Sequence, residues 1–103
     1  MPNTWGGRST FDYVGSVETG TRITFGQRRI VEVSAQQYAA LRRNFLNRTV
    51  PVGTSRTNAP DESLGSWLQT HVTPTAIASY VAPILILEEY AERAGDSDIC
   101  ITR

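Results

Sequence analysis

The stretch VTPTAIASYVAPILILEEYAE, residues 72–92, decides the fold because it is an almost unbroken apolar run. Thr73 followed by Pro74 is typical of the first residues of a helix, so the pattern predicts a long helix over residues 75–92. Its unbroken apolar part covers only residues 76–87, whereas a membrane span needs about 20 residues. We therefore expect a buried helix and no membrane span.

Pro83 and the breadth of the apolar surface raise the question of what covers this helix. Pro83 cannot donate a backbone hydrogen bond, so the carbonyl of Ser79 loses its helical partner and the helix should kink. Apolar side chains lie on more than one face, and one sheet with two short helices would leave some uncovered. We therefore expect a homodimer or higher oligomer, with an interface made by Ile77, Tyr80, Val81, Ile84, Leu85 and Leu87. A small ligand pocket at the kink is the alternative.

The first third of the chain alternates apolar and polar residues with a period of two. This pattern covers residues 11–17, 21–25 and 29–33, and it is typical of half-buried strands. Residues 18–20 and Gly26 provide the turns between them. The pattern predicts a three-stranded antiparallel meander.

Two helices and one short strand are expected between the meander and the apolar run. Ser34 and Gln37 fit a capping box, which begins the clearest helix of the sequence. A second, short helix is predicted over residues 61–72, and Pro51 confines a strand over residues 49–52 to a sheet edge.

Together these elements predict a single α+β domain over residues 1–103. We expect an antiparallel sheet of three to four strands packed by three helices, of which the last is long, apolar and kinked at Pro83. Residues 1–9 should form a loose arm, and residues 96–103 a short strand or a tail.

Composition narrows the functional classes. Ten basic and ten acidic residues give a formal net charge of zero, which counts against a nucleic-acid-binding protein and favours self-association. The single cysteine, Cys100, allows no intrachain disulfide, and the N-terminal residues show no signal peptide, so we expect a cytoplasmic protein.

The most suggestive polar stretch is GTSRT, residues 53–57. A flexible glycine, three hydroxyls and a guanidinium suit a phosphate or carboxylate, although loop hydroxyls more often bond their own backbone. The candidate anion site comprises Gly53, Thr54, Ser55, Arg56 and Thr57, joined by Arg42 and Arg43 if the helix packs beside the loop.

Signals of catalysis are weak. His71 is the only histidine, and no nucleophile-elbow motif is present. Glu88, Glu89 and Glu92 form an acidic group in which Glu89 should pair with Arg93 in solvent, and a desolvated Glu88 would be a general base. We expect no metal site and no cofactor.

Residues 63–103 resemble a winged helix-turn-helix in outline. SLGSWLQTHV would be the first helix, the apolar run would be the recognition helix, and LILEEYAER is similar to the LxxEGYVxR ending of such regulators. The resemblance implies DNA binding. The run lacks the cationic and amide side chains that read bases, so a DNA-binding regulator is an alternative only.

Residues 50–85 resemble small orphan bacterial proteins, some of them carried on integron gene cassettes. That resemblance implies an α+β fold, a bacterial cytosolic origin and self-association, and it transfers no catalytic residue. The sequence as a whole predicts a non-catalytic homo-oligomeric binding or accessory protein that takes a small anion or a partner protein. The alternatives are a winged-helix-like DNA-binding regulator and a small enzyme.

Overall fold

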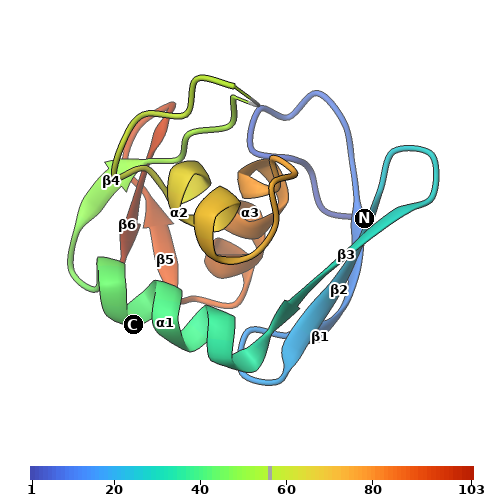
Figure 1. The fold of residues 1–103 in the computed structure, drawn as a ribbon, viewed down its shortest axis with the longest axis horizontal. Coiled ribbons are helices and arrows are strands. Elements are labelled where there is room, and N and C mark those ends of the chain that lie inside the picture. The colour runs from blue at the N-terminus through green and yellow to red at the C-terminus, as the bar shows by residue number, and fades with distance from the viewer. Residues whose placement is uncertain (56) are drawn as a thin grey trace.

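Two three-stranded antiparallel sheets and three helices make up the protein (Figure 1). The computed structural model describes residues 1–55 and 57–103. The α+β class is confirmed, but the strands form two small sheets and not one. The elements in chain order are β1 (Asp12–Ser16), β2 (Gly20–Phe25), β3 (Arg29–Ser34), α1 (Ala35–Phe45), β4 (Thr49–Pro51), α2 (Leu64–His71), α3 (Ala78–Leu87), β5 (Ala91–Arg93) and β6 (Asp98–Ile101).

The first sheet is the predicted meander, with the order β1-β2-β3. Ile23 pairs with Tyr13 on one side and with Val31 on the other, and its side chain is fully buried. Arg22 and Thr24, its neighbours in β2, are exposed on the opposite face. The period of two therefore separates a core face from a solvent face, as the sequence predicts.

The second sheet has the order β4-β6-β5. Its central strand β6 comes from the end of the chain, where the sequence suggests a short strand or a tail, and it buries Ile99 and Ile101. Pro51 lies in the edge strand β4, where the missing N–H breaks no ladder.

The helix α1 begins as the sequence predicts. The Ser34 hydroxyl accepts a hydrogen bond from the Gln37 backbone N–H at 3.1 Å, and the Gln37 side chain accepts one from the Ser34 N–H at 2.8 Å. Asn47 follows the helix with a positive φ of 60° and ends it. The buried face carries Tyr38, Leu41 and Phe45.

The prediction of a long, kinked last helix is wrong. α3 has ten residues, and residues 73–77 connect it to α2 instead of forming its first turns. The N–H of Thr73 closes α2 by bonding the carbonyl of Leu68 at 3.1 Å, so Thr73 does not cap α3. Ile77 is the N-cap, and it provides no side-chain hydrogen bond.

The other end of α3 also differs from the prediction. Glu89 adopts a left-handed φ of 66°, and the N–H of Tyr90 bonds the carbonyl of Leu85 at 2.8 Å. With the bond from the Glu89 N–H to Ile86, this geometry is a Schellman motif that lacks its usual glycine. The chain then turns into β5, so Glu89 and Arg93 do not lie one helical turn apart.

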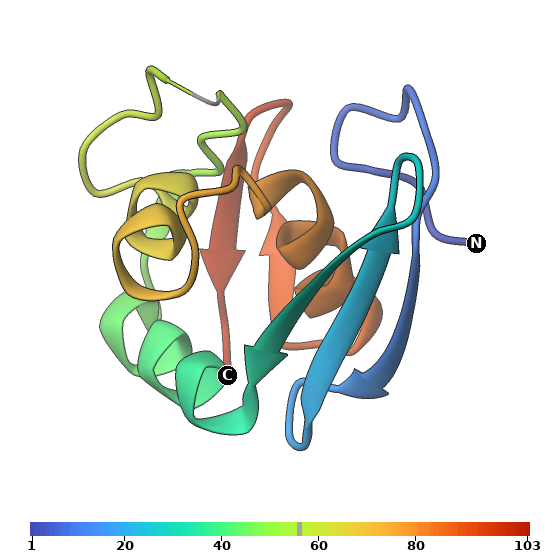
Figure 2. The same ribbon diagram turned by 45° about the vertical axis from the view of Figure 1, so that its right-hand side comes forward.

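The core lies around α3, which sits between the two sheets (Figures 1 and 2). Val81 and Ile84 are fully buried, and Tyr80 stacks on Phe25 with ring centroids 4.4 Å apart.

Among the described residues, no helix is long and apolar enough to cross a bilayer.

The N-terminal arm is packed against this core, and not loose. Trp5 is only 6% exposed, and its backbone N–H donates to the carbonyl of Ser79 at 2.9 Å. That carbonyl is the one that Pro83 deprives of its helical donor. The arm therefore satisfies the group that the proline leaves open.

Candidate functional site

The residues predicted to bind an anion do not lie together. Gly53, Thr54 and Ser55 line a hollow of about 370 Å³ whose only charged wall residue is Asp96, among the residues that the structure describes. A carboxylate there disfavours an anion. Arg56 lies outside the described residues.

The polar groups of the loop that begins at Gly53 stabilise the loop itself. The Ser55 hydroxyl accepts hydrogen bonds from the backbone N–H groups of Thr57 at 3.3 Å and Asn58 at 2.9 Å, which is the self-bonded turn that the sequence left as the alternative. A Cβ on Gly53 would lie 2.4 Å from the Ser63 hydroxyl, so the glycine allows the loop to pack on the start of α2.

Arg42 and Arg43 line a different hollow, of about 290 Å³, at the C-terminal half of α1. We call it the basic hollow; its wall residues are Ala39, Arg42, Arg43, Leu46 and Arg103. The sequence does not predict Arg103 as a member of this site, because no local pattern indicates that the last residues of the chain pack beside α1. The hollow brings together cations from two segments about sixty residues apart.

A tyrosine contacts two of the three arginines of the basic hollow, Arg42 and Arg103. The Arg42 guanidinium lies 4.3 Å from the centre of the Tyr90 ring, and that of Arg103 lies 4.9 Å from the same centre. Nε of Arg42 also donates to the backbone carbonyl of Arg103 at 2.6 Å. These contacts limit the conformations of two long side chains before any ligand arrives.

The Tyr90 hydroxyl is itself fixed by a hydrogen bond to Glu18 at 2.7 Å, which raises the pKa of Tyr90 and keeps it protonated. The Glu18 carboxylate therefore accepts a hydrogen bond from Tyr90 and forms no ion pair with the arginines of the basic hollow. Within residues 1–55 and 57–103, no Asp or Glu side chain forms an ion pair with Arg42, Arg43 or Arg103.

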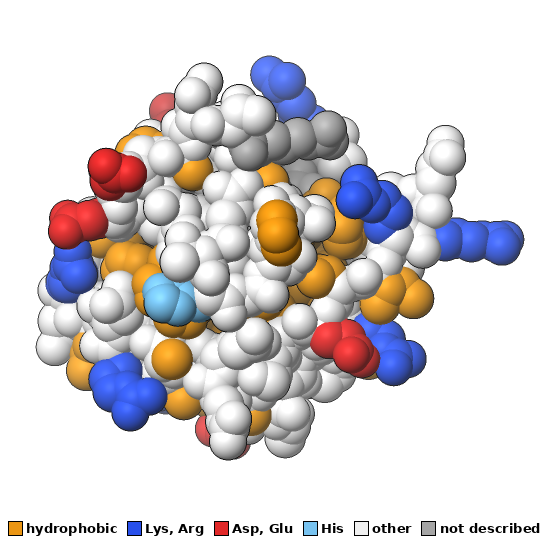
Figure 3. Space-filling model, viewed as in Figure 1, with side chains coloured by type: hydrophobic (Ala, Val, Ile, Leu, Met, Phe, Trp, Pro, Cys, Tyr) orange, Lys and Arg blue, Asp and Glu red, His pale blue; other side chains and the backbone are white. Residues whose placement is uncertain are grey.

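His71 lines a third hollow, of about 260 Å³, between α1 and α2. Its ring lies on Trp67 with centroids 4.5 Å apart, and Arg48 and Glu62 stand at the rim with their charged atoms 3.8 Å apart. Figure 3 shows hydrophobic side chains and charges of both signs around the histidine on this face. In the described part of the chain, no hydrogen bond joins the His71 ring to a carboxylate or hydroxyl, so the arrangement lacks an oriented base.

The three glutamates that follow α3 do not form a cluster. Glu88 accepts hydrogen bonds from the Tyr13 hydroxyl and from the backbone N–H of Val17, both at 2.9 Å, and so joins the end of α3 to the first sheet. Burial, followed by this bond to Glu88, raises the pKa of Tyr13 to about 12. Glu89 and Glu92 are exposed.

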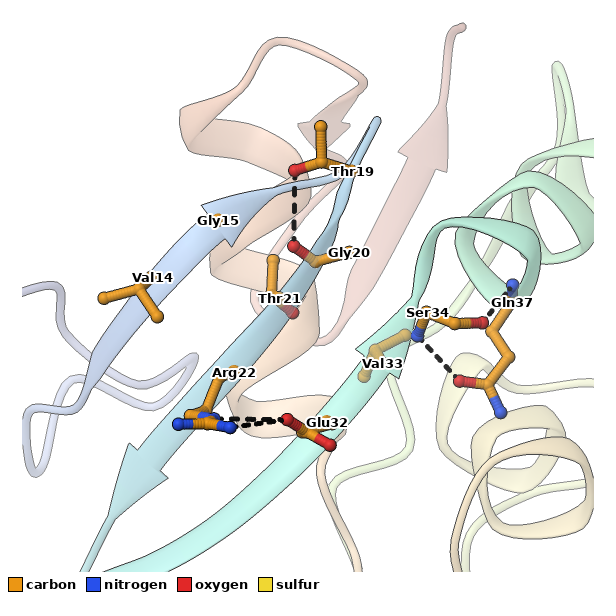
Figure 4. Close-up of a pocket in the computed structure, with 10 residues that line it drawn as sticks. All are labelled: Val14, Gly15, Thr19, Gly20, Thr21, Arg22, Glu32, Val33, Ser34 and Gln37. Atoms are coloured by element: carbon orange, nitrogen blue, oxygen red, sulfur yellow. Dashed lines mark hydrogen bonds and ion pairs between the residues drawn. The ribbon is translucent and has the colours of Figure 1, made fainter.

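A hollow of about 460 Å³, which the sequence did not predict, lies on the outer face of the first sheet (Figure 4). Gly15 and Gly20 leave its floor without side chains, and these two glycines are the signal that the sequence offered. Arg22 and Glu32 face each other across its wall at 3.1 Å. Because each charge already has its partner, this hollow offers a ligand little unsatisfied polarity.

The predicted oligomer interface is mostly interior. Ile77, Val81, Ile84 and Leu85 are each 0% exposed within one chain. Tyr80 is half-buried against Phe11 and Phe25. Leu87, at 58% exposed, is the single member of the set open to solvent. One chain therefore covers nearly all of the helix that we expected a second chain to cover.

No protein-family model, curated protein or solved structure matches this chain. Residues 63–103, which resemble a winged helix-turn-helix in outline, contain α2, α3, β5 and β6. α3 stands where that outline places the recognition helix. Here it is enclosed by the first sheet and the arm.

Proposed function

We propose that this protein is a non-catalytic binding protein that holds an acidic group in the basic hollow. The observation that carries the proposal is the convergence of Arg42, Arg43 and Arg103, which form no ion pair with an Asp or Glu side chain among the described residues. Guanidinium groups bind carboxylate and phosphate oxygens through paired, charge-assisted hydrogen bonds.

The apolar part of the wall narrows the ligand class. Leu46 is 46% exposed, and Ala39 stands beside it in the hollow. A ligand with carbon next to its acidic group, such as an organic polyacid or an acidic protein segment, would bury this surface while its anionic oxygens meet the arginines.

Titration with citrate, followed by NMR of the backbone amides, tests the proposal. We expect shifts centred on residues 39–46 and 103, and binding that weakens as salt is added. The double variant Arg42→Gln/Arg43→Gln should weaken citrate binding by at least about tenfold. Arg8→Gln/Arg28→Gln removes the same charge elsewhere and should leave binding unchanged. Equal loss in both variants would reduce the effect to net charge and reject the site.

A winged-helix-like DNA-binding regulator is the second candidate, because residues 63–103 contain two helices followed by two short paired strands, α2, α3, β5 and β6. The burial of Val81, Ile84 and Leu85 counts against it, since a helix must present its surface to enter a groove. A gel shift with mixed-sequence duplex at low salt distinguishes the two candidates: citrate binding without any shift of DNA favours the first.

We also propose that the protein self-associates and is cytoplasmic, as the sequence predicts. The basis for self-association is now narrower, because Leu87 alone of the predicted interface is exposed. Sedimentation of the purified protein at tens of micromolar measures the oligomeric state, and a monomer there would remove this part while leaving the basic hollow untouched.

A further inference from the structure

The apolar surface that α3 leaves uncovered lines a hollow of its own. Pro83 and Ile86 are half-buried and Leu87 is 58% exposed, and all three face residues 2–5 of the arm across a space of about 260 Å³. This hollow, which we call the arm hollow, lies at the place where the sequence left a ligand pocket as an alternative to a second chain.

One cation stands on the wall of the arm hollow. The guanidinium of Arg93 lies 3.8 Å from the centre of the Trp5 ring, and its Nη2 donates to the backbone carbonyl of Trp5 at 3.0 Å. Across the described ranges, no carboxylate pairs with Arg93. Its other N–H groups are therefore held in position without a charged acceptor.

Trp5, on which Arg93 rests, is fixed at both of its donors. Its backbone N–H bonds Ser79 at 2.9 Å, and its indole N–H donates to the backbone carbonyl of Asp96 at 2.8 Å. The arm hollow thus has a firm wall on the Trp5 side and an adaptable wall at Leu87. A preformed wall lowers the cost of ordering a site around its ligand.

We propose that the arm hollow binds a free aliphatic monocarboxylate of medium length. The hydrocarbon chain would lie against Pro83, Ile86 and Leu87, and the carboxylate would accept hydrogen bonds from Arg93. A single cation beside an apolar wall matches one negative charge at the end of an apolar chain. The volume is just below the usual range for ligand pockets, about 300–1,000 Å³, and so fits a ligand of roughly ten non-hydrogen atoms.

This site differs in chemistry from the basic hollow and stands independently of it. The basic hollow gathers three arginines and favours several negative charges, whereas the arm hollow offers one arginine and a mainly apolar wall. The two sites should therefore select different ligands, and a variant in one should leave the other intact.

Octanoate is the probe for the test, with octan-1-ol and octylammonium as matched controls of equal chain length. A ligand of this size should bind with a Kd on the order of 1 mM. We expect octanoate to shift the indole N–H resonance of Trp5 and the amides of Ile86, Leu87 and Arg93. Octan-1-ol should bind about tenfold more weakly because it forms no charge-assisted bond, and octylammonium weaker still.

Charge substitutions at Leu87 test the same proposal without disturbing the core, since that side chain is 58% exposed. Leu87→Asp adds a negative charge to the wall of the hollow that holds the octanoate anion, whereas Leu87→Lys adds a positive one, so octanoate should bind about tenfold more weakly to the Asp variant than to the Lys variant. Arg93→Gln should abolish the preference for octanoate over octan-1-ol, with thermal unfolding checked to confirm that the arm stays folded.

The proposal would be overturned by equal affinity for octanoate and octan-1-ol, by equal affinity in the two Leu87 variants, or by no shift at Trp5 with octanoate on the order of 10 mM. Arg42→Gln/Arg43→Gln should leave octanoate binding unchanged. A loss of octanoate binding there would assign the carboxylate to the basic hollow and would also overturn the arm hollow as its site.

Discussion

α1 and α3 are of similar length, eleven and ten residues, yet they are held in opposite ways. α1 begins at a capping box made by its own neighbours Ser34 and Gln37. α3 has no side-chain cap: the Trp5 N–H bonds the Ser79 carbonyl that Pro83 leaves open, and Glu88 at the other end of the helix accepts the Val17 N–H of the first sheet. The start of α1 can therefore be predicted from neighbouring residues, whereas α3 depends on contacts with segments that are distant in sequence.

The largest test of this comparison is Trp5→Ala. The substitution removes a buried side chain, since Trp5 is only 6% exposed where the arm packs on the core. We expect it to lower the free energy of unfolding by about 3–5 kcal/mol, measured by urea denaturation. Val14→Ala, at a position 65% exposed, is the control and should change little. A loss near zero for Trp5→Ala would show that α3 is stable without the arm.

Glu88→Gln tests the attachment at the other end of α3. It keeps the shape of the side chain but removes the charge that accepts from the Val17 N–H and the Tyr13 hydroxyl. Hydrogen bonds to charged groups contribute about 1.5–3 kcal/mol, so a loss of about 2 kcal/mol is expected. Glu92→Gln on the exposed side of β5 should stay within about 0.5 kcal/mol. Similar losses for both would contradict a specific role for Glu88.

Ser34→Ala and Thr73→Ala compare the two predicted caps directly. Ser34 caps α1, so its loss should cost about 1 kcal/mol in the free energy of unfolding. Thr73 fits the same pattern in the sequence but precedes α3 by several residues, and its replacement should cost only a few tenths. Chemical denaturation of the pair side by side measures the difference, and a larger loss at Thr73 would restore the longer α3 that the sequence predicts.

Glu89→Gly is the smallest expected effect and the one with a favourable sign. Glu89 holds a left-handed φ of 66° in the Schellman motif, where glycine carries no steric penalty. The gain is partly offset by the greater freedom of glycine in the unfolded chain, which leaves about 0.5 kcal/mol of net stabilisation. Glu92→Gly, in β5, should destabilise instead. A destabilised Glu89→Gly variant would mean that this side chain makes a contact that matters.

These contrasts explain which parts of the fold the sequence could predict. The meander and α1 follow from alternation and from a capping box, which are short-range signals. β4 and β6 fall where the sequence suggests short strands, but β5 has three residues and no alternation, so this strand had no local signature. Pro83 correctly marked the carbonyl of Ser79 as open, but its donor lies in Trp5, and no spacing rule connects residues so far apart.

The candidate sites divide in the same way. Residue chemistry identified Arg42 and Arg43 as potential anion ligands, but it grouped them with the loop at Gly53, because both segments carry suitable donors. The chain instead places Arg42 beside Arg103 and Tyr90. The sequence predicts a helical ion pair between Glu89 and Arg93. Because α3 ends at Leu87, Arg93 instead lies in β5, beside Trp5.

The bond between the Trp5 indole and Asp96 joins residues 91 positions apart, and the central strand of the second sheet lies later still. During synthesis, the N-terminal meander therefore leaves the ribosome with its inner face, including Ile23 and Phe25, waiting for partners that have not yet been made. Contacts this distant in sequence slow folding. The apolar face of that sheet stays exposed until residues 96–101 have been made, so a chaperone that shields it would raise the yield of folded protein.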